Sequence, residues 1–275
     1  MGRVDGKIAF ITGAARGQGR SHAVRLAREG ADVIAVDLCQ QIDTVPYPMS
    51  TPDDLAETAR LVEQEGRRCL TFQTDVRDIN ALAAAADQGA DELGGIDIVI
   101  ANAGILAFAL GPEDLDEAAA SFGDAIGVML TGVFNTVRVT QHRLIEQGRG
   151  GSVVIISSTA GLIGSPGESG GIAGYTASKH GVVGLMRGYA KLLGPHHVRV
   201  NSIHPTAVAT PMVVNEAFAK LYSDSKAMSE LTPRALPVNM IEPSDVSDAI
   251  MWLVSDGAKY VTGVTLPVDA GVTCP

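Results

Sequence analysis

The sequence predicts a single α/β domain, a doubly wound parallel sheet with helices on both faces. Short apolar runs rich in β-branched residues alternate along the chain with segments of helical periodicity, as is typical of such sheets. Of the 275 residues, 46% are hydrophobic and only 4% aromatic, so the core consists mainly of Ala, Val, Ile and Leu. The sequence shows neither a linker nor an internal repeat, which favours one domain over residues 1–275.

The first elements form a strand, a helix and a second strand. Residues 7–12 are an apolar run, a glycine-rich turn follows, and apolar residues then recur at helical spacing. Gly30 ends this helix, and residues 32–36 form a run of the kind buried on both faces of a parallel sheet.

The same alternation continues to the end of the chain. The remaining predicted helices lie at 53–64, 79–93, 124–147, 175–193 and 245–253, and the remaining strands at 69–73, 96–101, 152–157, 198–203 and 265–268.

Two stretches interrupt this rhythm. An insertion at 40–52 contains Pro46, Pro48 and Pro52 and exceeds the ~2–6 residues common between a strand and the next helix. A polar stretch at 210–242 contains scattered apolar residues, and we interpret it as a lid over a substrate site.

Composition excludes several classes of function. Lys and Arg number 21 against 31 Asp and Glu, and the net charge of −10 has the wrong sign for a nucleic-acid partner. The three cysteines have neither paired nor C-x-x-C spacing, so we expect no metal site and a cytoplasmic location. The start lacks the apolar run of a signal peptide, and apolar runs fall short of the ~20 residues that span a bilayer, so we expect no membrane association.

A glycine-rich turn follows the first predicted strand. In Gly13-x-x-x-Gly17-x-Gly19 the glycines let the backbone approach a pyrophosphate, whose charge meets free N–H groups at the next helix. Such a turn is typical of Rossmann-type dinucleotide-binding domains, although strand-to-helix turns also need glycine for steric reasons. Arg16 and Gln18 belong to this predicted cofactor site; for Arg16, a solvated side chain is favoured over a phosphate ligand.

An acidic residue ends the second predicted strand. Asp37 lies about 20 residues beyond the turn, where a carboxylate can bind both ribose hydroxyls of NAD and repel the 2′-phosphate of NADP. Neither Leu38 nor Cys39 supplies a cation for that phosphate. The sequence therefore predicts NAD as the cofactor, with Asp37 and Leu38 at its adenosine end.

Further motifs, in the same order along the chain, make it resemble the short-chain dehydrogenase/reductase family over residues 4–271. With the glycine turn they are Asp75-Val76, Asn102-Ala103-Gly104, Ser158 with Tyr175-x-x-x-Lys179, and Tyr260-Val261-Thr262-Gly263. The opening Gly2-Arg3-Val4-Asp5-Gly6-Lys7 and the insertion resemble the mycofactocin-dependent and carveol-dehydrogenase-like members.

The resemblance and the chemistry of alcohols predict the catalytic residues. Oxidation needs a base for the hydroxyl proton while hydride leaves for the nicotinamide, and a phenol with a pKa near ~10 is a poor base at neutral pH. Lys179 lies one helical turn from Tyr175, so we expect its ammonium to lower that pKa. By resemblance Lys179 also holds the nicotinamide ribose. Ser158 would hold the substrate oxygen, with Ser157 as the alternative.

The resemblance also implies the remaining cofactor contacts. Asp75 would contact the adenine, with Val76 beside its ring, and Asn102-Ala103-Gly104 would pack against the adenosine half. The segment near the nicotinamide carboxamide would comprise Pro205, Thr206, Val208 and Thr210.

One position departs from the family pattern. The family usually has asparagine immediately before Leu130-Thr131-Gly132, where this chain has Met129, and a thioether cannot position a relay water as an amide does. Asn135 falls on another face of the helix and is no substitute. We therefore expect slow turnover or a rerouted proton relay.

These observations predict an NAD-dependent oxidoreductase that interconverts an apolar secondary alcohol, terpenoid- or steroid-like, and its ketone. The alternatives are a 3-oxoacyl reductase of fatty-acid type, which Asp37 disfavours, and a dinucleotide-binding protein with weakened catalysis. If the insertion folds over the cofactor, NAD would stay bound and electrons would leave through an external carrier; a surface loop is the alternative. By resemblance we expect a homotetramer that pairs the helices at 124–147 and 175–193.

Overall fold

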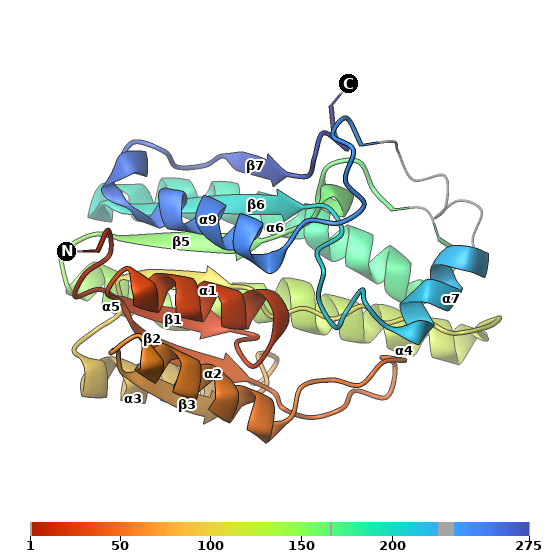
Figure 1. Ribbon diagram of the computed structural model, residues 1–275, viewed down its shortest axis with the longest axis horizontal. Coiled ribbons are helices and arrows are strands. Elements are labelled where there is room, and N and C mark those ends of the chain that lie inside the picture. Colours follow the sequence, from red (N-terminus) through yellow and green to blue (C-terminus); the bar gives the residue numbers. More distant parts are fainter. Residues whose placement is uncertain (1, 166, 225–233, 275) are drawn as a thin grey trace.

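The computed structural model describes residues 2–165, 167–224 and 234–274, and its centre is a 7-stranded parallel sheet (Figure 1). The strands lie in the order β3-β2-β1-β4-β5-β6-β7. Their bounds are β1 Ile8–Thr12, β2 Asp32–Asp37, β3 Cys69–Gln73, β4 Ile98–Ala101, β5 Gly151–Ile156, β6 Val198–Pro205 and β7 Thr265–Val268. The order reverses between β1 and β4, and such a point opens a crevice at the carboxyl ends of the strands.

Helices cover both faces of the sheet. In Figure 1, α1 (Gly17–Arg28), α2 (Pro52–Gln64) and α9 (Pro243–Val254) lie in front of it. Behind it lie α3 (Ile79–Leu93), α5 (Gly132–Glu146) and α6 (Gly170–Leu193), and α4 (Leu115–Ile126) packs against α6. β1, β2 and β4 are buried along their whole length because both faces are covered.

The predicted helix at 124–147 is part of a longer helical run. It begins at Leu115, where Asp114 and Glu117 form a reciprocal capping box, and passes through a π-helical segment, Gly127–Thr131, into α5. By length and composition Leu115–Glu146 could span a membrane: its most apolar 18-residue window has a mean hydropathy of 1.2, and 33% of that window is buried in the protein. Buried helices of globular proteins share these properties, and Met129, Val137 and Leu144 of this run are fully buried in the core.

The helix that contains Tyr175 and Lys179 also begins earlier than predicted. α6 starts at Gly170 instead of residue 175 because the carboxylate of Glu113 accepts a hydrogen bond from the Gly170 N–H at 2.7 Å. A Cβ at Gly170 would overlap the Ala118 carbonyl oxygen, so this turn packs directly on α4. The added turn is thus held by contacts with distant residues.

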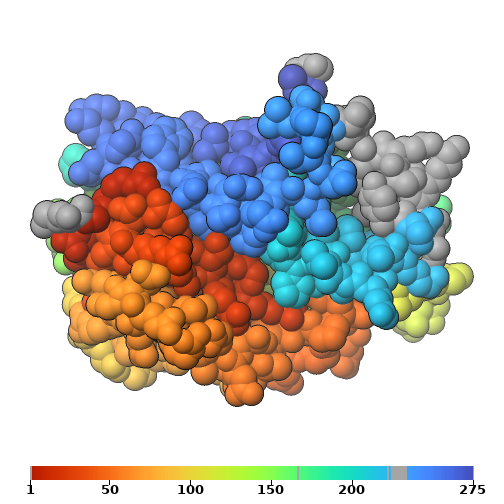
Figure 2. All heavy atoms as spheres, viewed as in Figure 1, coloured from red at the N-terminus to blue at the C-terminus, as the bar shows by residue number. Residues whose placement is uncertain are grey.

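The predicted lid contains one described helix. α7 (Glu216–Asp224) follows β6, and the part of the lid from 225 to 233 lies outside the described residues. Figure 2 shows the cyan atoms around α7 beside the orange atoms of the insertion at 40–52, on the side of the molecule where the strands end. Both segments line one pocket, because Met49 and Met212 are both part of its wall.

Candidate active site

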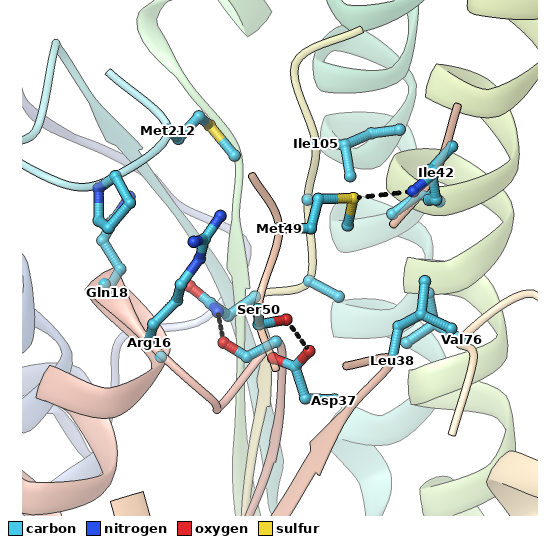
Figure 3. A pocket seen from close by; sticks show the side chains of 18 of the residues that line it. Arg16, Gln18, Asp37, Leu38, Ile42, Met49, Ser50, Val76, Ile105 and Met212 are labelled. Atoms are coloured by element: carbon cyan, nitrogen blue, oxygen red, sulfur yellow. Dashed lines mark hydrogen bonds between the residues drawn. The ribbon is translucent and has the colours of Figure 1, made fainter. Parts of the chain in front are cut away.

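A pocket at the carboxyl ends of β1, β2 and β4 brings together the predicted dinucleotide-binding residues (Figure 3). Those that line it are Gly13, Arg16, Gly17, Gln18, Gly19, Asp37, Leu38, Asp75, Val76, Asn102, Ala103, Gly104 and Thr210. We call this cavity the dinucleotide pocket. It lies where the strand order reverses, the position at which doubly wound sheets bind their ligands.

Two glycines of the turn, Gly13 and Gly19, lie at positions with no space for a side chain. Gly13 has φ +68°, and a Cβ there would lie 2.8 Å from the Cα of Ala103. A Cβ at Gly19 would overlap the Gly13 carbonyl oxygen. The Asn102 amide donates hydrogen bonds to the carbonyls of Thr12 and Gly13 at 2.9 and 3.1 Å. The backbone at the start of α1 is therefore held open to an anionic group such as a pyrophosphate.

The carboxylate of Asp37 is fixed by three donors. Oδ2 accepts from the Ala15 N–H at 2.9 Å, and Oδ1 accepts from the Cys39 N–H at 3.1 Å and from the Ser50 hydroxyl at 2.7 Å. Figure 3 shows Asp37 and Ser50 joined within the pocket. A negative charge held there disfavours the additional phosphate of NADP.

On the adenine side, the predicted contact residue Asp75 is already paired. Its Oδ2 lies 2.7 Å from the Arg77 guanidinium, which also reaches Asp124 of α4 at 2.8 Å. The Asn135 amide donates to the Val76 carbonyl at 2.8 Å. Asn135 therefore supports the adenine-side loop, in agreement with the inference that it does not replace the missing relay amide.

The insertion at 40–52 lies against the dinucleotide pocket. Ile42, Tyr47, Met49 and Ser50 line that pocket, and Tyr47 is 4% exposed. Arg16, for which we favoured a solvated side chain, donates a hydrogen bond from Nη2 to the Pro48 carbonyl at 2.6 Å. The side chain therefore joins the glycine turn to the insertion.

Two further contacts hold the insertion to the other side of the site. The Thr44 hydroxyl donates to Asp124 at 2.8 Å, and the Tyr47 hydroxyl accepts from the Leu106 N–H at 3.0 Å. With the Ser50 and Arg16 contacts, these bonds attach the insertion to β2, the glycine turn, α4 and the segment after β4. The insertion is therefore a cover over the pocket.

Ser158, Tyr175 and Lys179 meet where β5 ends beside α6. The Ser158 and Tyr175 side chains line one cavity, and the Ser158 hydroxyl acts on the Tyr175 phenol to lower its pKa. The Lys179 ammonium lies 5.5 Å from the centroid of the Tyr175 ring and donates to the Ile156 carbonyl at 2.8 Å. Because α6 places Tyr175 and Lys179 one turn apart, both side chains face the end of β5.

Burial dominates the electrostatics of this group. It raises the pKa of the Tyr175 phenol, and the Ser158 hydroxyl offsets this only in part. Burial also lowers the pKa of Lys179 to about 8. The net pKa of Tyr175 is therefore raised by enclosure, and the expected influence of Lys179 on it stays a prediction. The phenol is protonated at neutral pH and suited to donate a proton.

Neighbouring side chains position this group through the backbone. The Ser157 hydroxyl donates to the Lys179 carbonyl at 2.8 Å, so Ser157 supports α6, and Ser158 faces the phenol. His204 of β6 contacts the Ser158 carbonyl through Nδ1 and the Ser202 hydroxyl through Nε2, each at 2.9 Å. His204 carries little signal in the local sequence beyond its place at the end of a buried strand, before Pro205.

Ser158 and Tyr175 open into a second cavity, which we call the apolar pocket. Its apolar lining comprises Leu106, Ile172, Met212, Val213 and Phe218, and the predicted nicotinamide-side residues Pro205, Thr206 and Val208 also line it. Gln18, Thr210 and Met212 line both pockets, so the two adjoin. At this junction the buried Oε1 of Gln18 has no hydrogen-bond partner among the described residues, as suits a ligand with an N–H or O–H group.

Met129 occupies the π-helical segment and is fully buried. Its Sδ would lie 3.8 Å from a Cβ at Gly104, so the thioether packs on the backbone beside the dinucleotide pocket. The expected effect of Met129 on a proton relay stays a prediction.

Comparison with known proteins agrees with this geometry. Residues 13–273 match the family model described as enoyl-(acyl carrier protein) reductase. An uncharacterized oxidoreductase of Mycobacterium tuberculosis is 54% identical over 270 residues, covering 98% of this chain and 96% of that protein. The (−)-trans-carveol dehydrogenase of Rhodococcus erythropolis is 46% identical over 281 residues, covering 99% of both. The chain belongs to the short-chain dehydrogenase/reductase family.

Solved structures of this family superpose closely. Carveol dehydrogenase from Mycobacterium avium, in complex with NAD, has 47% identity and a TM-score of 0.90, with 100% of both chains covered. A short-chain dehydrogenase from Mycobacterium paratuberculosis, bound to NAD, has 44% identity and a TM-score of 0.91, with 99% of both covered. The predicted family, fold class and oxidoreductase class are confirmed.

Proposed function

We propose that the protein interconverts an apolar secondary alcohol and its ketone, with NAD as cofactor and Tyr175 as proton donor and acceptor. The observation that carries this proposal is the Ser158–Tyr175 pair, which lies in an apolar pocket that adjoins the dinucleotide pocket. Asp37 and the NAD-bound relatives support the choice of cofactor.

The reaction divides between the cofactor and the side chains. Bound NAD supplies hydride transfer at its nicotinamide ring. The Ser158 hydroxyl holds the substrate oxygen, and Tyr175 exchanges a proton with it. Because burial raises the pKa of Tyr175, the phenol donates a proton to a ketone at neutral pH, whereas alcohol oxidation becomes faster as pH rises. Below its pKa of about 8, the Lys179 ammonium stabilises a phenolate formed at Tyr175.

The lining of the apolar pocket supports a compact, largely hydrocarbon substrate, of terpenoid or steroid type. Leu106, Ile172 and Phe218 supply apolar surface, while Ser158 and Tyr175 supply hydrogen-bonding groups for one oxygen. Thr159, Ser165 and Thr206 add hydroxyl groups to the lining, and such polar groups orient a substrate within apolar walls. The name of the carveol dehydrogenase relative agrees with a cyclic terpenoid alcohol.

Tyr175→Phe tests the catalytic assignment. We expect it to abolish hydride transfer with carveol, followed by absorbance at 340 nm, and to leave NAD binding largely intact. Tyr189→Phe is the matched control, because Tyr189 lies on the same helix and outside both pockets. Near-normal activity in Tyr175→Phe would remove Tyr175 from the mechanism.

The insertion supports a second element of the proposal, that NAD stays bound through turnover and electrons leave through an external carrier. Its contacts with Asp37, Arg16, Asp124 and Leu106 must separate before a dinucleotide beneath it can leave. The test is to measure NAD in acid extracts of extensively dialysed protein. Nucleotide-free protein that turns over with added NAD would contradict retention.

We also propose a cytoplasmic homotetramer that pairs α5 and α6. Phe134 of α5 and Leu192 of α6 are 39% and 59% exposed. A Cβ at Gly184 or Gly188 would meet nothing within 4 Å, so both face open space, whereas Gly181 packs on Leu130 of the same chain. Light scattering tests this state, and a monomer in solution would contradict it.

A further inference from the structure

A short segment after β4 separates the two pockets. It comprises residues 105–107, which we call the wall segment, and all three residues are buried. Ile105 lines the dinucleotide pocket, and Leu106 lines the apolar pocket. The position of this segment therefore affects the shape of both cavities.

A tyrosine of the insertion holds the wall segment. The Tyr47 hydroxyl accepts a hydrogen bond from the Leu106 N–H at 3.0 Å, although the residues are 59 positions apart. Tyr47 and Leu106 are only 4% and 8% exposed. A buried N–H that loses its acceptor costs free energy, so this bond constrains Leu106 while the insertion is seated.

The wall segment also touches the catalytic helix. A Cβ at Gly171 would overlap the Ala107 carbonyl oxygen, so the backbone of α6 contacts the wall segment there. The next residue, Ile172, lines the apolar pocket, and Tyr175 follows on the same helix. A displacement of Leu106 would therefore shift the neighbouring part of α6 and change the shape of the apolar pocket.

We propose that Tyr47 is a positioning residue for substrate binding, which holds Leu106 in place and so couples the cover over the dinucleotide to the apolar pocket. The proposal rests on the function proposed above. A compact apolar ketone or alcohol then binds tightly only while the hydrogen bond between Tyr47 and Leu106 is made, although Tyr47 is not among the residues that line the apolar pocket.

The test compares Tyr47→Phe with Thr44→Val. Tyr47→Phe keeps the ring and removes only the acceptor for Leu106. Thr44→Val removes another bond of the insertion, to Asp124, and neither of those residues lines either pocket. Both variants should release NAD faster than the wild type, measured as nucleotide lost on rapid desalting. The second measurement is the Kd of carvone, the ketone of carveol, by calorimetry with NAD saturating.

We expect Tyr47→Phe to weaken carvone binding about three- to tenfold, as loss of one buried hydrogen bond implies, with kcat changed less than about twofold. Thr44→Val should leave the carvone Kd unchanged. Equal carvone affinity in Tyr47→Phe and wild type, or equal weakening in both variants, would overturn the proposal, and so would a wild type that binds no carvone. If the wild type binds carvone but transfers no hydride, the proposed reaction is wrong. The comparison of Kd values between the variants and the wild type would still decide the role of Tyr47.

Discussion

Replacing Lys179 with methionine should stabilise the protein while it abolishes turnover. Lys179 is 5% exposed, and burial lowers its pKa from 10.5 to about 8. At ~1.4 kcal/mol per pKa unit, the folded state loses about 3 kcal/mol at pH 7 by holding the charge there. Lys179→Met removes that cost and also removes the bond to the Ile156 carbonyl, worth about 1 kcal/mol. The net gain is about 2 kcal/mol, or a rise in Tm of roughly 4–8 °C.

The pH dependence identifies the cause of this gain. Between pH 8 and 10.5 the unfolded chain binds more protons at this lysine than the folded chain, so wild-type stability rises with pH and the advantage of the variant shrinks. Thermal unfolding at pH 7 and pH 10, with NAD content matched, measures both effects. Lys191→Met is the control, because Lys191 lies exposed on the same helix. A variant less stable than wild type at pH 7, by an amount independent of pH, would refute the reasoning.

Three further substitutions test other parts of the site and fold. Asp37→Ser should reduce the preference for NAD over NADP about a hundredfold, measured as the ratio of kcat/KM values, since it removes a fixed negative charge; an unchanged ratio would exclude Asp37 as the selector. Met129→Asn should raise kcat and cost about 1–3 kcal/mol of stability, because it restores a relay amide in an apolar site; an unchanged rate would mean that the missing amide does not limit turnover. Burial lowers the pKa of His22 to about 3, so wild-type stability should fall between pH 6.5 and 3 at up to ~1.4 kcal/mol per pH unit. Urea unfolding of His22→Gln should show a weaker fall, and equal slopes would contradict this origin.

The strands could be predicted because their burial is a property of local sequence. The predicted strands at 7–12 and 32–36 coincide closely with β1 and β2, which are buried along their whole length, and apolar runs bounded by turn residues have few other interpretations. The start of α4 has a helix-start signal in the local sequence, because Asp114 and Glu117 have the spacing of a capping box. Its first residue, Leu115, is 89% exposed, which hides the helical periodicity.

The start of α6 could not be predicted in the same way. Gly170 and Gly171 are typical of a loop, and glycine within a helix is unfavourable. Here Glu113 caps the helix from a distant segment, and the absence of side chains lets the backbone pack on Ala118 and Ala107. These are tertiary contacts, which no window of local sequence contains.

The same distinction between local sequence and tertiary contacts applies to the site. The motifs identified Ser158, Tyr175 and Lys179 because the chemistry requires those groups at that spacing, and the structure places them together. The raised pKa of Tyr175 could not be predicted, because it depends on how completely the phenol is enclosed, and residues far from the motif determine that.

The division of labour within the site follows from which parts of the fold hold each residue. Ser158 is held through its carbonyl by His204 of the neighbouring strand, and Lys179 is fixed to the Ile156 carbonyl of β5, so the proton-transfer group is anchored to the centre of the sheet. The wall of the apolar pocket instead depends on Leu106, which Tyr47 of the insertion holds by one hydrogen bond, and on Phe218 of α7. Changes in these peripheral segments alter binding without displacing the reacting groups. Under the proposed function, we therefore expect substitutions in the insertion and α7 to alter substrate preference more than the reaction itself.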